Sequence, residues 1–92
     1  MIKRFKHKGL RSFFKSGGAS GIQPQHATRP RQILALIETA DSVEDMYLPG
    51  LNLHKLKGQR KGTYVVIVRG NWRVTFKIIN GDILGVNYED DR

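Results

Sequence analysis

The sequence contains no cysteine, which excludes a disulfide framework and thiolate metal sites. It has no apolar run long enough to cross a membrane, and Ile2 is followed at once by Lys3 and Arg4, unlike a secretory signal peptide. Acidic residues are scarce as well, since 8 Asp and Glu stand against 16 Lys and Arg, for a net charge of +8. These absences predict a cytoplasmic protein whose basic surface favours a polyanionic partner, either nucleic acid or an acidic protein.

The 92 residues suffice for one hydrophobic core, so we predict a single domain spanning residues 1–92. Apolar spacing predicts a short opening strand over Met1–Phe5, a basic helix over His7–Lys15 and a longer helix over Arg31–Ala40. A run of strands follows in the second half of the chain. This order predicts the α+β class, with two N-terminal helices packed on one face of a small antiparallel sheet.

Two dipeptides that favour tight hairpin turns, Gly70-Asn71 and Asn80-Gly81, divide the C-terminal part into three predicted strands. If each dipeptide is the whole loop, alternation places every second side chain on a face that the helices leave open. A bulge in the last strand would instead shift its register and turn its side chains over. The simpler register predicts a core face with Val65, Ile67, Trp72, Val74 and Phe76, and a mixed, open face with Tyr64, Arg73, Lys77, Tyr88, Asp90 and Arg92.

A basic loop, Leu-His-Lys-Leu-Lys-Gly-Gln-Arg-Lys-Gly at 53–62, precedes the first of these strands. Lys and Arg suit a phosphate backbone, and His54 can transfer a proton near neutral pH. In RNA the 2′-OH can attack the adjacent phosphate if a base removes its proton, cations stabilise the transition state and an acid protonates the leaving oxygen. The residue types needed are present, with His54 or Asp90 for proton transfer, Lys57 and Arg73 for charge, and Tyr88 or Tyr64 for base stacking.

Simpler roles are open for the same residues. A single His in a basic loop is often a solvated surface residue, and the cations around it can contact phosphate without catalysis. Arg73 can equally form a structural ion pair with Asp90 or Asp91. The acidic run from Glu89 to Asp91 is also typical of a solubilising tail. The residues alone therefore indicate an RNA-binding surface and leave catalysis as one of two interpretations.

Five segments carry a resemblance in this order and spacing: Met-Ile-Lys-x-Phe-Lys-His-Lys-Gly-Leu at 1–10, Ile-Glu-Thr-Ala at 37–40, the basic loop at 53–62, Val-x-x-Asn-Trp-Arg-Val-Thr-Phe at 68–76 and Asn-Tyr-Glu-Asp at 87–90. On them the chain resembles the HigB-type toxins of bacterial type II toxin–antitoxin systems, within the RelE superfamily of ribosome-dependent mRNA interferases. The resemblance implies cleavage of mRNA in the ribosomal A site through a 2′,3′-cyclic phosphate, without a metal or other cofactor. It also implies a cognate helix-turn-helix antitoxin, HigA, whose complex with the toxin binds promoter DNA.

Taken residue by residue, the resemblance assigns catalysis to His54, Lys57, Arg73 and Asp90. Around them we predict RNA contacts from Lys55, Arg60, Lys61, Tyr64, Lys77, Tyr88 and Arg92. The family commonly ends Asp-Tyr-His, whereas this chain ends Asp90-Asp91-Arg92, and an Arg cannot act as an acid at neutral pH. Two alternatives therefore stay open, a ParE-like protein-binding toxin and a ribosome- or RNA-binding module with impaired catalysis.

Overall fold

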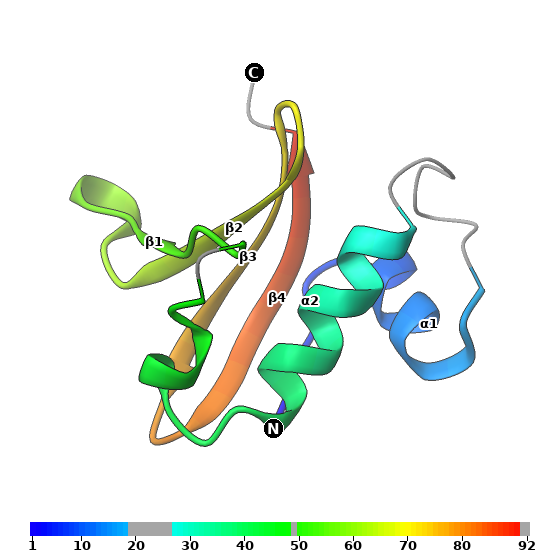
Figure 1. The fold of residues 1–92 in the computed structure, drawn as a ribbon, viewed down its shortest axis with the longest axis horizontal. Helices are drawn as coiled ribbons and strands as arrows, with labels where there is room; N and C mark the ends of the chain where they lie inside the picture. The colour runs from blue at the N-terminus through cyan, green and yellow to red at the C-terminus, as the bar shows by residue number, and fades with distance from the viewer. Residues whose placement is uncertain (19–26, 49, 91–92) are drawn as a thin grey trace.

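The structure, a computed structural model, describes residues 1–18, 27–48 and 50–90 and has a helical layer on one face of a twisted antiparallel sheet (Figure 1). The predicted α+β class, with two helices on one face of the sheet, is confirmed. The helices are α1 (Lys8–Ser16) and α2 (Thr28–Thr39), with 3₁₀ turns η2 (Val43–Met46) and η3 (Gly58–Arg60). The sheet has the order β1-β2-β3-β4, with β1 (His54–Lys55), β2 (Thr63–Arg69), β3 (Trp72–Ile79) and β4 (Asp82–Asp90).

Local sequence signals explain both ends of α1 and are compatible with the first turn of α2. The His7 Nδ1 accepts a hydrogen bond of 3.0 Å from the Leu10 N–H at the start of α1, and Gly17 ends that helix with a left-handed φ of 79°. Pro30 lies in the first turn of α2, where the missing N–H costs no helical hydrogen bond. No helix in the described ranges is long and apolar enough to cross a membrane.

The N-terminal segment lies beside β4 (Figure 1). Ile2 and Phe5 form isolated parallel bridges with Ile83 and Val86, so the opening strand predicted over Met1–Phe5 is reduced to two bridges. Backbone hydrogen bonds reinforce this contact, including a bond of 2.7 Å from the Lys6 N–H to the Val86 carbonyl. The segment therefore covers the outer edge of β4, which would otherwise expose unpaired backbone groups.

Both predicted hairpin turns are present, since Arg69 pairs with Trp72 and Ile79 with Asp82. The register between Ile67 and Arg69 shifts by one residue, however, which marks a bulge in β2. Beyond it Val66 pairs with Val74 and Tyr64 with Phe76, and all four lie on the helix-covered face. The prediction that Val65 and Ile67 face the core and Tyr64 the open side is wrong, because one extra residue turns a strand over.

A second bulge lies in β4. Thr75 pairs with Asn87 and Lys77 with Leu84, so Gly85 and Val86 together stand opposite one residue of β3. Gly85 has a left-handed φ of 63°, which suits glycine at a bulge. The shift pairs Tyr88 with Val74 on the helix-covered face, so the prediction that Tyr88 lies on the open face is wrong. The alternative of a bulge in this strand is confirmed instead.

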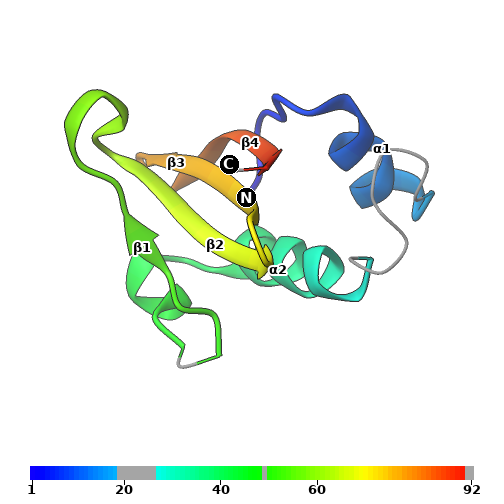
Figure 2. The same cartoon turned by 90° about the horizontal axis from the view of Figure 1, so that it is seen from above.

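The hydrophobic core lies between the helices and one face of the sheet. Its members from the helices are Leu10, Phe13, Ile33, Leu34 and Ile37, and those from the sheet are Tyr64, Val66, Val68, Val74, Phe76, Ile83, Val86 and Tyr88. Viewed from above, α2 lies on one side of the sheet, and the segment between β1 and β2 curls on the opposite side (Figure 2). No α-helix among the described residues covers the opposite face of the sheet, which we call the open face.

Replacing Gly85 with alanine is expected to destabilise the fold by about 1–2 kcal/mol, the usual cost of a left-handed conformation for an L-residue. No atom lies within 4 Å of the added Cβ, so the cost arises from the backbone conformation rather than from a clash. Urea denaturation measures the change. Gly50→Ala is the matched control, because its Cβ also meets nothing within 4 Å and its φ is outside the left-handed region. Equal stability of the two variants would contradict the prediction.

Candidate nucleic-acid interface on the open face

The pairing register defines which side chains share the open face. Residues directly opposite one another in antiparallel strands lie on the same side of the sheet. Three cross-strand rows follow from this rule: His54, Val65, Thr75 and Asn87; then Ile67, Arg73 and Glu89; and finally Thr63, Lys77 and Leu84. The sheet therefore brings His54 of β1 and Arg73 of β3, both predicted from the sequence, to one face in neighbouring rows.

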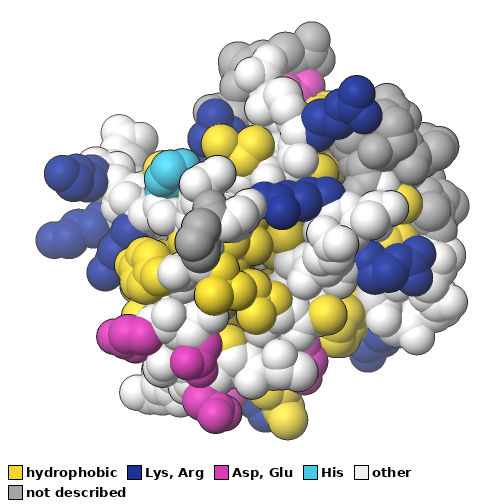
Figure 3. Space-filling view, in the orientation of Figure 1, with side chains coloured by type: hydrophobic (Ala, Val, Ile, Leu, Met, Phe, Trp, Pro, Cys, Tyr) yellow, Lys and Arg dark blue, Asp and Glu magenta, His cyan; other side chains and the backbone are white. Residues whose placement is uncertain are grey.

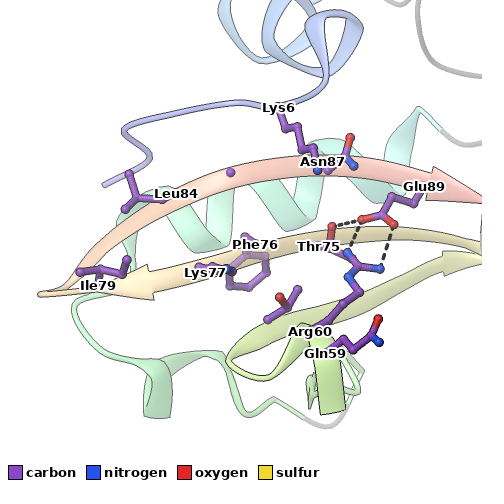
Figure 4. A pocket seen from close by; sticks show the side chains of 12 residues that line it. Lys6, Gln59, Arg60, Thr75, Phe76, Lys77, Ile79, Leu84, Asn87 and Glu89 are labelled. Carbon is purple, nitrogen blue, oxygen red and sulfur yellow. Dashed lines mark hydrogen bonds and ion pairs between the residues drawn. The ribbon is translucent and has the colours of Figure 1, made fainter. Parts of the chain in front are cut away.

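A hollow of about 420 Å³ lies on this face (Figure 4). Three cations from separate parts of the chain line it: Lys6 from the N-terminal segment, Arg60 from η3 and Lys77 from β3. The other lining residues are Gln59, Thr63, Thr75, Phe76, Ile79, Leu84, Gly85, Asn87 and Glu89. A concave surface with cations on its rim suits a polyanionic ligand such as an RNA strand.

Arg60 crosses part of this hollow to form a bidentate ion pair with Glu89 of β4 (Figure 4). Its Nη1 and Nη2 lie 3.1 and 2.7 Å from Oε1 and Oε2 of the carboxylate, and the Thr75 hydroxyl also donates to Oε2. The Arg60 guanidinium, with help from Thr75, holds the pKa of Glu89 below its ordinary value, and partial burial opposes the shift only in part. Glu89 is therefore ionised at neutral pH.

β1 and the loop that follows it present most of the other predicted cations. Lys55, Lys57 and Lys61 are exposed and line a second hollow of about 520 Å³ together with Leu56 and Gly58. Dark-blue side chains project from the β1 side of the molecule in Figure 3, whereas acidic side chains gather near η2. The Lys side chains at this edge favour contact with phosphates.

Two predicted base-stacking residues lie on the helix-covered face instead. Tyr64 is stacked on Phe76 with ring centroids 5.9 Å apart, and Tyr88 is stacked on Trp72 at 4.6 Å. Tyr88 is only 5% exposed, and both tyrosines belong to the hydrophobic core. Lys55 reaches the edge of this core, with its Nζ 5.5 Å from the centroid of the Tyr64 ring. Neither tyrosine presents its ring to the open face.

The predicted acid, Asp90, lies elsewhere than the simpler register expects. Asp90 pairs with Trp72 in the register, whereas Arg73 pairs with Glu89. The prediction that Asp90 shares a face with Arg73 is therefore wrong, because the bulge at Gly85 moves Glu89 into that place. Arg92 lies outside the described residues.

Sequence reasoning missed the role of three residues that line the first hollow. Glu89 was interpreted only as part of a solubilising tail, and neither Thr75 nor Lys6 was assigned a role. The available signal was Gly85, because a glycine inside a predicted strand often marks a bulge. Counting that bulge would have placed Glu89 beside Arg73 on the open face.

Helices on one side of a small antiparallel sheet, with a basic surface on the other, place the protein in the RelE-like class of toxins. Residues 3–91 match the family described as the RelE-like toxin of the type II toxin–antitoxin system HigB, and the chain belongs to that family. The endoribonuclease HigB of Proteus vulgaris is 46% identical to it over 90 residues, which cover 98% of each chain. The predicted family is confirmed, and a toxin of this family implies an antitoxin partner.

Proposed function

We propose that this toxin is an endoribonuclease that cleaves mRNA in the A site of the ribosome and so inhibits translation. The observation that carries the proposal is the 46% identity, across nearly the whole chain, to a protein named as an endoribonuclease. The open face supports it with chemistry suited to RNA, since the register brings His54 and Arg73 to the same side beside a loop rich in lysine.

In the proposed reaction the 2′-OH of the substrate is the nucleophile. It loses its proton to a base and bonds to the adjacent phosphorus, the bond to the 5′ oxygen breaks, and that oxygen takes up a proton. The products are a 2′,3′-cyclic phosphate and a 5′-OH, and the proposed reaction consumes no cofactor. We assign proton transfer to His54 and charge stabilisation to Lys57 and Arg73. For Asp90, which pairs with Trp72 at the end of β4 and not with Arg73, a part in proton transfer stays a prediction.

The proposed partners follow from the basic surface and the family. The net charge of +8 favours the phosphate-rich A site of the 30S subunit and the mRNA within it. The antitoxin is proposed to be a HigA-type helix-turn-helix protein, and the complex of the two to bind operator DNA. Phosphate contacts are proposed for Lys55, Arg60, Lys61 and Lys77, which are all exposed.

Primer extension on a reporter mRNA, translated in vitro with and without the toxin, tests this proposal. We expect discrete cuts that need ribosomes and are absent when naked RNA is treated in parallel. Ribosome co-sedimentation without any cut would instead support a binding module whose chemistry is impaired by the Asp91-Arg92 terminus. Inhibited gyrase supercoiling with intact RNA would support a ParE-like toxin.

A further inference from the structure

The ion pair between Arg60 and Glu89 joins the two edges of the sheet (Figure 4). Arg60 belongs to the loop between β1 and β2, at one edge, and Glu89 lies on β4, at the other. Thr75 of β3, which lies between them, donates its hydroxyl to the same carboxylate. The arrangement thus connects the basic loop to a strand that is remote from it in the sheet.

The backbone bonds within this loop are local. The Leu56 N–H donates to the Thr63 carbonyl at 2.8 Å, and the Lys61 N–H donates to the Gly58 carbonyl at 3.1 Å. β1 itself is two residues long, His54–Lys55. Short pairing and local turns leave a loop free to move relative to the sheet. A bidentate side-chain bond to β4 restricts that movement, since it sets both the distance and the direction between the loop and the strand.

Glu89 is poorly suited to touch the RNA itself. A carboxylate on a face that binds RNA repels the phosphates. Its two oxygens are engaged by Arg60, and one also accepts from Thr75. Because Arg60 keeps its pKa low, the carboxylate is also a weak base and holds no proton to donate at neutral pH. What it can do is orient the cation that it binds.

We propose that Glu89 is a positioning residue, which acts through Arg60 to hold residues 56–62 over the open face. The loop in this position presents Lys57, a proposed catalytic cation, to the RNA. Thr75 supports the carboxylate from β3 and completes the arrangement. This inference rests on the proposed ribonuclease function, and it assigns to Glu89 a role in placing the cationic loop rather than in bond making or breaking.

Glu89→Gln tests the inference, because it keeps the shape of the side chain and removes the charge that binds Arg60. On ribosomes programmed with labelled mRNA, we expect kcat to fall about 10- to 100-fold, the usual cost of displaced reactive groups. KM should stay the same or fall, since a charge that repels RNA is lost. Amide hydrogen exchange should become faster at Leu56 and Lys61, whose N–H groups report on the loop.

Glu44→Gln is the matched control, because Glu44 is exposed on η2 and does not line the hollow. It should leave kcat, KM and loop exchange unchanged. An unchanged kcat in Glu89→Gln would overturn the inference, as would a reduced kcat with unchanged loop exchange, which would mean a direct catalytic role. Faster exchange throughout α2 would also overturn it, because Glu89 would then support the whole fold. Absence of cleavage by the wild-type toxin would instead refute the proposed function.

Discussion

His54→Ala is expected to reduce mRNA cleavage on programmed ribosomes by about 10²–10⁴-fold, the usual contribution of a positioned acid or base. His54 is exposed on β1 and shares a row of the open face with Thr75 and Asn87. Its removal opens no cavity in the core, so stability should change by less than about 0.5 kcal/mol. Single-turnover cleavage and thermal unfolding of the same preparation measure the two quantities.

Added imidazole should partly restore cleavage by this variant, because it supplies the missing proton-transfer group without the positioning. Gln32→Ala is a suitable control, since it removes an exposed polar side chain from α2 on the other side of the sheet. Full cleavage by His54→Ala would show that the residue is a solvated surface histidine, the simpler of the two interpretations that the sequence allows.

Arg73→Ala is expected to reduce cleavage about 10²–10³-fold, as does the removal of other groups that stabilise transition-state charge. Arg73 is half-buried on β3 and lies on the open face, opposite Ile67 and Glu89 in the neighbouring strands. A guanidinium held by a strand is better fixed than one on a loop, which favours precise contact with a phosphate. Cleavage should fall while the melting temperature changes by only a few degrees.

Arg31→Ala provides a comparison with the same loss of charge on α2, where the guanidinium lies 5.0 Å from the centroid of the Phe13 ring. It should cleave mRNA at nearly the wild-type rate. Arg73→Lys should retain part of the activity, because the charge remains and the bidentate geometry is lost. A collapse of the melting temperature in Arg73→Ala would show that Arg73 is chiefly structural, and the predicted catalytic role would be wrong.

Features that depend on nearby residues could be predicted well. The apolar spacing of Leu10 and Phe13, followed by Gly17, indicates α1, and the Pro30 position is compatible with the first turn of α2. Gly70-Asn71 and Asn80-Gly81 indicated both hairpins, since the conformation of a tight turn depends on only a few residues. The basic character of the loop at 53–62 could also be predicted, because it follows from the residue types alone.

The faces of the strands could not be predicted in the same way. Tyr64 and Tyr88 each lie beyond a bulge, and a single inserted residue moves the rest of a strand to the other side. Both β2 and β4 carry apolar side chains at odd and even positions, so either register buries several of them. The register is determined by how well each strand face packs against the helices, and that packing exists only when the two layers are assembled.

The sequence by itself determined the two helices, the two hairpin turns, the excess of cations and the family, because each depends on residue types and on short spacings. Gly85 was a local signal for the bulge that places Glu89 beside Arg73, but only the tertiary structure decided between the two registers and brought Arg60 to Glu89 across β3. That outcome depends on the bulge at Gly85 and on contacts between residues 29 positions apart, Arg60 and Glu89. Such contacts form only when the sheet closes over its core, so no local pattern encodes them.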